Sequence, residues 1–79
     1  MPTPVRLPNL GAEASEARVA GWIRDVGDTV TAGEPIAEIE TEKATVELTA
    51  PVTGRLSEIL VPAGEDAAVG TTMAMIEEV

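Results

Sequence analysis

The hydrophobic positions of this chain fall in short segments that glycine and proline separate. Glycine stands at seven positions and proline at six, and only residues 36–50 offer the roughly 10–12 uninterrupted residues that an ordinary helix needs. The other segments are short and enriched in Val, Ile and Thr, which is typical of strands. Short strands at regular spacing predict a sandwich or a barrel.

The stretch from Ile36 to Ala50 is predicted to be a hairpin rather than a helix. On a helix, its four large apolar residues would not form a single stripe. Folded as a hairpin with Glu42 and Lys43 at the tip, the stretch pairs apolar residues on one face and polar residues on the other. The expected pairs are Ile39 with Val46, Ala37 with Leu48, Glu38 with Glu47, and Glu40 with Thr45.

The tip of this hairpin does not follow turn propensity. Two-residue hairpin turns favour Asn-Gly or Asp-Gly, whereas Glu42 and Lys43 stand here. The pairing of Glu38 with Glu47 also places like charges opposite each other, a cost that exposure to water would reduce. We therefore infer that something other than turn propensity selects Glu-Lys at the tip.

The chain repeats itself weakly at a constant offset of 37 residues. Residues 27–40 match residues 64–77, and each copy contains an acidic turn, a glycine turn and a strand. Both glycines of the first copy recur in the second, as expected of turns that need a positive φ. Two copies are too few for a solenoid, so we expect two interlocked halves related by a pseudo-two-fold axis. The hairpin and the chain termini should then lie at opposite ends of the molecule.

Composition excludes several classes of function. The 79 residues are 44% hydrophobic and 24% charged, which indicates one globular domain. Without Cys or His, the chain has no disulfide, no thiolate chemistry and none of the commonest metal ligands, and no metal site is expected. No apolar run approaches the ~20 residues that span a bilayer, and no signal-peptide pattern is present, so we expect a cytoplasmic protein. The net charge of −9 argues against nucleic acid and anionic membranes as partners.

Lys43 is the only lysine in the chain, and the other four basic residues are arginines. An amine can be acylated or form a Schiff base, whereas a guanidinium stays charged and unreactive. The single reactive amine therefore stands at the hairpin tip. A solitary exposed lysine would keep a high pKa and be a poor base, so no catalysis by the domain itself is expected.

The residues around Lys43 resemble the lipoyl-attachment motif of 2-oxo acid dehydrogenase acyltransferases. In that motif an acidic residue, Lys and Ala follow Glu-Thr, as they do from Glu40 to Ala44. The resemblance extends over nearly the whole chain, through fragments in the family's order and spacing. These fragments are Leu7-Pro8-Asn9-Leu10-Gly11, Trp22, Val26-Gly27-Asp28-Thr29-Val30, Gly33-Glu34-Pro35-Ile36 and Ala50-Pro51-Val52-Thr53-Gly54.

The resemblance implies an all-β fold and a carrier function. The implied fold is a flattened β-barrel (barrel-sandwich hybrid) of two four-stranded antiparallel sheets, with residues 1–79 forming a single lipoyl-attachment domain. Lipoic acid would be amide-linked to Lys43, with Glu42 and Ala44 as the flanking motif, and would carry acyl groups and electrons between the active sites of a 2-oxo acid dehydrogenase-type complex. The domain would be part of, or a partner to, a dihydrolipoamide acyltransferase. Other implied partners are a lipoate-attaching enzyme, a thiamine-dependent 2-oxo acid decarboxylase and dihydrolipoamide dehydrogenase, beside the acyltransferase core.

Two departures from the family pattern bear on the partners. The residue before the Lys is usually Asp, and here it is Glu42. The Glu-Gly pair that often follows Gly11 is replaced by Ala12-Glu13, in a loop that usually lies beside the modified Lys and helps the decarboxylase to recognise the domain. The parent complex stays open among those for pyruvate, 2-oxoglutarate, branched-chain 2-oxo acids and acetoin.

Two other functions are compatible with the same fold. A biotin carrier typically has Met on both sides of the Lys, where Glu42 and Ala44 stand in this chain. An unmodified barrel that serves as an interaction module often lacks a Lys at the tip. The sequence therefore favours a lipoyl carrier over both alternatives.

Overall fold

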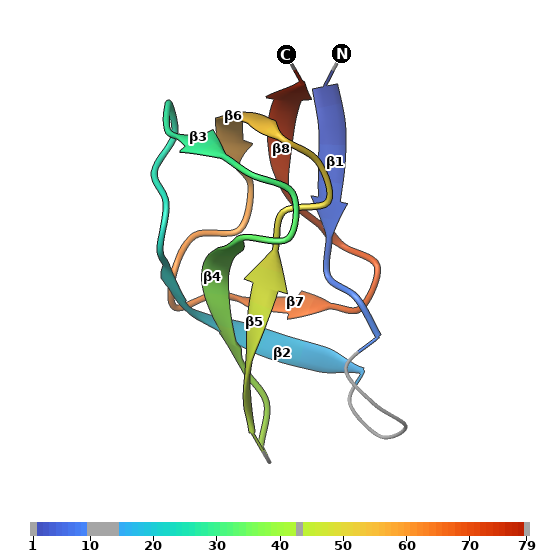
Figure 1. Ribbon diagram of the computed structural model, residues 1–79. Coiled ribbons are helices and arrows are strands. Elements are labelled where there is room, and N and C mark those ends of the chain that lie inside the picture. The colour runs from blue at the N-terminus through green and yellow to red at the C-terminus, as the bar shows by residue number, and fades with distance from the viewer. Residues whose placement is uncertain (1, 10–14, 43, 79) are drawn as a thin grey trace.

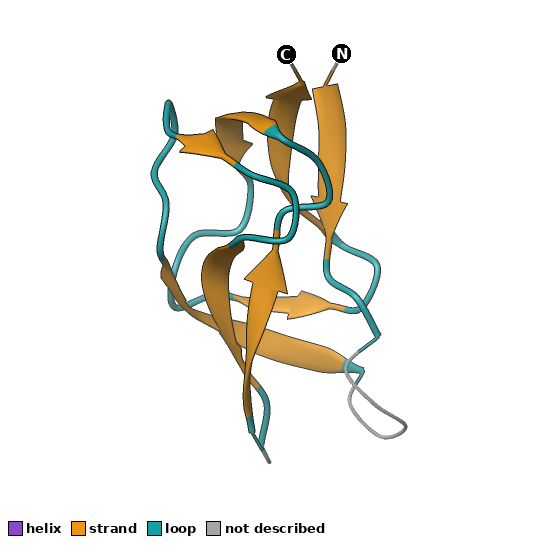
Figure 2. Cartoon of the chain, in the orientation of Figure 1, coloured by secondary structure: helices purple, strands orange, loops and turns teal. Residues whose placement is uncertain are grey.

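The computed structural model describes residues 2–9, 15–42 and 44–78, and every regular element in them is a strand (Figures 1 and 2). The strands are β1 (Pro2–Arg6), β2 (Glu16–Trp22), β3 (Thr29–Val30), β4 (Pro35–Glu40), β5 (Thr45–Thr49), β6 (Gly54–Ile59), β7 (Asp66–Ala68) and β8 (Thr72–Glu78). The all-β fold class is therefore confirmed.

The strands form two four-stranded antiparallel sheets. One sheet has the order β1-β8-β6-β3 and the other has the order β5-β4-β2-β7. In Figure 1 the termini emerge side by side at one end, and the hairpin of β4 and β5 projects from the other end. The molecule is elongated, with extents of 36 × 20 × 18 Å. The flattened two-sheet barrel, and the separation of the hairpin from the termini, are both as expected.

The 37-residue repeat reflects a pseudo-two-fold relation between the sheets. The N–H of Gly27 donates to the carbonyl of Leu56 at 2.7 Å, and the N–H of Gly64 donates to the carbonyl of Val19, 37 residues before Leu56, at 2.8 Å. All four recurring glycines have φ between 88° and 100°. The relation extends beyond the repeated segments, because β2 corresponds to β6 and β5 to β1 in the two strand orders. The halves interlock, since β3 and β7 each lie in the sheet of the other half.

The core lies between the sheets and consists of small and branched side chains. No polar or charged side chain is buried in the described ranges. The largest fully buried side chains are Leu7, Ile36, Ile39, Leu56, Met73, Ile76, Val5, Val19 and Val30. Trp22 packs against the edge of this core, and its Nε1 donates to the carbonyl of Val61 at 2.9 Å. The only indole of the chain is thus a structural contact between β2 and the segment after β6.

Gly54, the first residue of β6, stands where two backbones come close together. It pairs with Val30 of β3 on one side and Glu78 of β8 on the other. A Cβ added at Gly54 would lie 2.3 Å from the carbonyl oxygen of Glu77 and 2.9 Å from a methyl of Ile76. Backbone atoms in a paired strand cannot move aside, so glycine is required at this position.

We expect Gly54→Ala to destabilise the domain by about 1–3 kcal/mol, the usual cost of an overpacked site. Gly21→Ala is the matched control, because Gly21 also lies in a strand, lacks a positive φ and has nothing within 4 Å of an added Cβ. The control should be neutral or slightly more stable, since alanine restricts the unfolded chain. Urea unfolding measures both variants, and equal stabilities would contradict the close approach at Gly54.

Candidate functional site

The hairpin of β4 and β5 has the register expected from the sequence. Its apolar pairs face the core and its polar pairs face water. The paired residues are Ala37 with Leu48, Glu38 with Glu47, Ile39 with Val46, and Glu40 with Thr45. A register shift between Pro35 and Ala37 leaves two successive residues, Ile36 and Ala37, both buried. The hairpin interpretation of residues 36–50 is therefore confirmed, with one bulge that the alternation did not predict.

The turn at the end of the hairpin is closed by Thr41 and Ala44. The N–H of Thr41 donates to the carbonyl oxygen of Ala44 at 2.8 Å. The Thr41 hydroxyl donates to the same oxygen at 3.0 Å and accepts the N–H of Ala44 at 3.1 Å. Glu42 and Ala44, the predicted flanking residues, are both exposed. Lys43, the predicted attachment residue, lies outside the described residues, and so does the loop segment with Ala12 and Glu13.

The outer face of the hairpin is acidic. Glu38, Glu40 and Glu47 are exposed, and Glu38 lies directly opposite Glu47 as expected. Water around these carboxylates reduces the repulsion between them. Arg18 of β2 lies opposite Glu40 in the register. It is the one basic residue within the four strands of this sheet. The surface that leads to the turn is consequently dominated by negative charge.

An open cavity of about 440 Å³ adjoins the turn. It is lined by Ser15, Glu16, Ala17, Arg18, Glu40, Thr41, Glu42 and Asp66. Arg18 Nε lies 3.3 Å from Asp66 Oδ1, and both side chains are 60% exposed, so this ion pair contributes less than about 1 kcal/mol to stability. Small-molecule sites are mostly apolar, whereas this lining is mostly polar, and the cavity therefore suits a polar surface better than an apolar ligand.

The sequence alone does not predict that Arg18 and Asp66 lie beside the turn of the hairpin. The two residues are 48 positions apart, and only the pairing of β2 with β7 joins them. The repeat offers no signal for this pair either, because the residue 37 positions before Asp66 is the uncharged Thr29.

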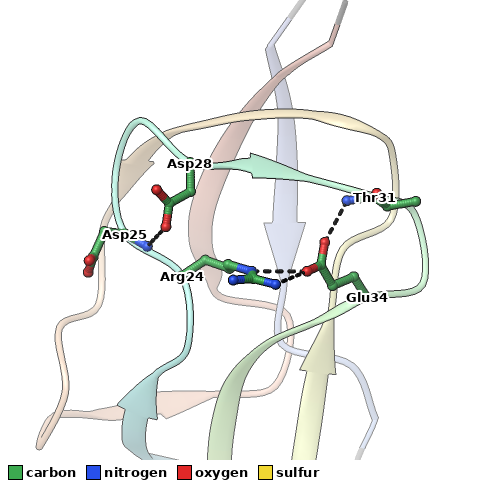
Figure 3. Close-up of polar contacts among 5 residues, drawn as sticks. All are labelled: Arg24, Asp25, Asp28, Thr31 and Glu34. Carbon is green, nitrogen blue, oxygen red and sulfur yellow. Dashed lines mark hydrogen bonds and ion pairs between the residues drawn. The ribbon is translucent and has the colours of Figure 1, made fainter.

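The base of the hairpin is braced by Glu34, the residue before β4 (Figure 3). One carboxylate oxygen accepts the N–H of Thr31 at 2.8 Å, and the other accepts Nε of Arg24 at 2.9 Å and also Nη2 of the same guanidinium. The Thr31 N–H, followed by Arg24, lowers the pKa of Glu34, and the same carboxylate raises the pKa of Arg24. The carbonyl of Glu34 also accepts the N–H of Ala50 at 2.9 Å. This cluster therefore ties the start of β4 to the residue that follows β5.

The carboxylates of the hairpin do not form a coordination site. Within residues 2–9, 15–42 and 44–78, no group of three or more His, Cys, Asp or Glu could hold a metal ion. In the same ranges no helix has the length and hydropathy needed to cross a membrane.

Known proteins resemble this chain over almost its whole length. A family model described as Biotin-requiring enzyme, which covers biotin and lipoyl attachment, matches residues 3–76. The chain is 39% identical over 77 residues to the dihydrolipoyllysine-residue succinyltransferase component of a 2-oxoglutarate dehydrogenase complex from Bartonella vinsonii subsp. berkhoffii, and the match covers 98% of the chain and 19% of that relative. It is 38% identical over 74 residues to the dihydrolipoyllysine-residue acetyltransferase component of a pyruvate dehydrogenase complex from Corynebacterium glutamicum, with 94% and 11% covered. The chain therefore spans less than a fifth of the length of these relatives.

A solved domain resembles the chain from end to end. The solution structure of the lipoyl domain of the 2-oxoglutarate dehydrogenase complex from Azotobacter vinelandii superposes with a TM-score of 0.73 at 26% identity. The match covers 96% of this chain and 98% of that one. The correspondence is thus with a whole domain, in contrast to the partial coverage of the acyltransferases.

We expect Glu34→Gln to destabilise the domain at neutral pH but not in strong acid. Because folding lowers the pKa of Glu34, the ionised carboxylate stabilises the fold above the usual glutamate pKa of about 4.3. That contribution is lost as the pH falls through the lower pKa of the folded state. Thermal melts from pH 7 to pH 2 should therefore converge for the wild type and the variant.

Glu58→Gln is the control for the loss of one surface charge, because Glu58 is exposed on β6. Its melting temperature should follow that of the wild type across the whole pH range. A wild-type advantage over Glu34→Gln that is as large at pH 2 as at pH 7 would contradict the role of the ionised carboxylate.

Proposed function

The chain belongs to the biotin- and lipoyl-attachment family, as a lipoyl domain of the 2-oxo acid dehydrogenase acyltransferase type, and we propose that it carries lipoic acid in amide linkage on Lys43. The turn closed by Thr41 and Ala44 is the observation that carries this proposal. An attaching enzyme must enclose the lysine amine, and a fixed turn at the end of a hairpin is a small and accessible target. The hairpin projects from the end of the molecule away from the termini (Figure 1).

The residues beside position 43 fit an amide-linked group. Glu42 and Ala44 are exposed, and the hydrogen bonds that close the turn join Thr41 to Ala44. A chain extended from the intervening lysine would therefore displace no side chain of the described core. When bound, lipoic acid supplies a disulfide that can accept an acyl group and two electrons. The contribution of this domain is to hold the attachment residue in a defined place.

The proposed role is that of a swinging arm in a 2-oxo acid dehydrogenase-type complex. The arm would move acyl groups and electrons among a thiamine-dependent 2-oxo acid decarboxylase, an acyltransferase core and dihydrolipoamide dehydrogenase, after a lipoate-attaching enzyme has modified Lys43. The exposed carboxylates of Glu38 and Glu47 support this role, because a negative face would be steered toward a basic entrance of a decarboxylase. The base cluster of Arg24 and Glu34 and the closed turn keep the carrier rigid at both ends of the hairpin.

The domain boundaries and the parent complex are part of the proposal. We propose that residues 1–79 act as one lipoyl-attachment domain, in the cytoplasm, as part of or beside a dihydrolipoamide acyltransferase. The relatives come from complexes named for 2-oxoglutarate and for pyruvate, and both are candidate parents. A biotin carrier is not favoured, because these relatives are dihydrolipoyllysine acyltransferases and the similar solved domain is a lipoyl domain.

Protein from a host supplied with lipoate should carry one lipoyl group, and peptide mapping should place it on Lys43. Lys43→Arg should abolish the modification. The double variant Lys43→Arg/Arg55→Lys is the matched control, because it keeps one lysine on the exposed surface of β6 and should stay unmodified. Biotinylation by a biotin ligase, with a lipoate ligase inactive on the domain, would overturn the assignment.

Lys43→Ala should separate function from folding. The described hydrogen bonds of the turn come from Thr41 and Ala44, so we expect a stability change within about ±0.5 kcal/mol, together with complete loss of lipoylation and acyl transfer. Ile39, which is 1% exposed, is the contrasting site. Ile39→Ala should cost roughly 2–5 kcal/mol, a large share of the stability of so small a domain, and should impair lipoylation indirectly.

Thermal melts and one lipoylation assay distinguish these outcomes. An unfolded Lys43→Ala domain, or one that still accepts acyl groups, would refute Lys43 as the anchor of the arm.

A further inference from the structure

We propose that the Thr41 hydroxyl is a positioning group, which holds Thr41 against Ala44 in the one geometry that an attaching enzyme accepts. Thr41 follows the last residue of β4, and Ala44 precedes the first residue of β5. The inference rests on the proposed function, because it concerns the same turn. It adds a residue that acts through its hydrogen bonds to the backbone of Ala44.

The turn needs support that its central residues do not supply. Two-residue hairpins favour turn types I′ and II′, and both types require a positive φ at the first central residue. Glu42 is that residue, and no non-glycine residue in the described ranges has a positive φ. Turns without it do not match the twist of the flanking strands and tend to splay them. A hairpin that must present a lysine cannot use Asn-Gly, so its strands have to be held together in another way.

The side chain of Thr41 provides this closure. Its Oγ1 donates to the carbonyl oxygen of Ala44 at 3.0 Å and accepts the N–H of Ala44 at 3.1 Å. One hydroxyl thus engages both polar groups of the Ala44 backbone, beside the main-chain bond from the Thr41 N–H at 2.8 Å. Two such side-chain bonds, in competition with water, correspond to about a tenfold change in the equilibrium constant between the closed and the open turn.

The effect should be confined to the turn. Ile39 and Val46 form the last apolar pair before the tip, and the Arg24–Glu34 cluster braces the opposite end of the hairpin. Loss of the hydroxyl should leave these contacts in place and lower only the fraction of molecules with a closed turn. The apparent affinity of an enzyme that binds the closed form falls in proportion to that fraction. The KM for the domain should therefore rise while kcat stays nearly unchanged.

Three substitutions separate the hydroxyl from the rest of the side chain. Thr41→Val keeps the branched shape and removes the hydroxyl, whereas Thr41→Ser keeps the hydroxyl and removes the methyl. Thr49→Val is the matched control, because Thr49 is an exposed threonine at the other end of β5. In steady-state lipoylation by a lipoate–protein ligase, Thr41→Val should raise the KM about threefold, because a tenfold shift of the equilibrium divides between the closed and the open fractions, with kcat within about twofold of wild type. Thr41→Ser and Thr49→Val should stay within about twofold of wild type in both constants.

Amide hydrogen exchange of the unmodified domain gives a readout that does not depend on the ligase. Thr41→Val should speed exchange at Ala44 about threefold, in step with the rise in KM, and leave the buried Ile76 of β8 unchanged. If the wild type is not lipoylated at all, the proposed function fails, and exchange at Ala44 still decides whether the hydroxyl holds the turn.

Three results would each overturn the positioning role. They are an unchanged KM in Thr41→Val, equal losses in Thr41→Val and Thr41→Ser, and a fall in melting temperature as large as that of Ile39→Ala.

Discussion

Each half of the domain places a glycine turn against a strand of the other half, and main-chain hydrogen bonds are exchanged across the contact. The N–H of Gly27 reaches the carbonyl of Leu56, whose own N–H returns to the carbonyl of Asp28. Gly64 makes the corresponding contact with Val19. Each sheet is completed by a short strand of the other half, β3 in one sheet and β7 in the other. The positive φ of these glycines therefore serves the contact between the two halves, and β4 of the hairpin packs its buried side chains into the core that the halves share.

The extent to which the sequence predicts this fold differs from one element to another. Alternation between Ile39 and Val46 on one side and the glutamates on the other leaves only one register for the hairpin, because a slip by one residue would expose the apolar face. The bulge that buries both Ile36 and Ala37 has no such signature, since it depends on how β4 meets β5 in three dimensions. The sequence likewise does not predict that β5 corresponds to β1, because these strands lie outside the 37-residue repeat.

The residues of the candidate site also differ in how far the sequence predicts them. The resemblance around the single lysine pointed to Lys43, Glu42 and Ala44 at once, because such a motif is local in sequence. The sequence does not single out the hydroxyl of Thr41, since threonine is also an ordinary strand residue. Its hydrogen bonds to Ala44 depend on the folded turn. Long-range neighbours such as Asp66 in the adjoining cavity need the pairing of β2 with β7, which no short motif encodes.

The pairing of β1 with β8 has a mechanical consequence. Pro2 lies opposite Glu77, so the first and last strands end side by side, at the end of the barrel away from the hairpin (Figure 1). Any segment that continues the chain from either strand would make this end a pivot. If the barrel rotated about this end as a rigid body, a small rotation would move the turn along an arc with a radius close to the 36 Å long axis. Pivoting of the whole body would thus add to the reach of a flexible side chain, and would do so without deforming the core.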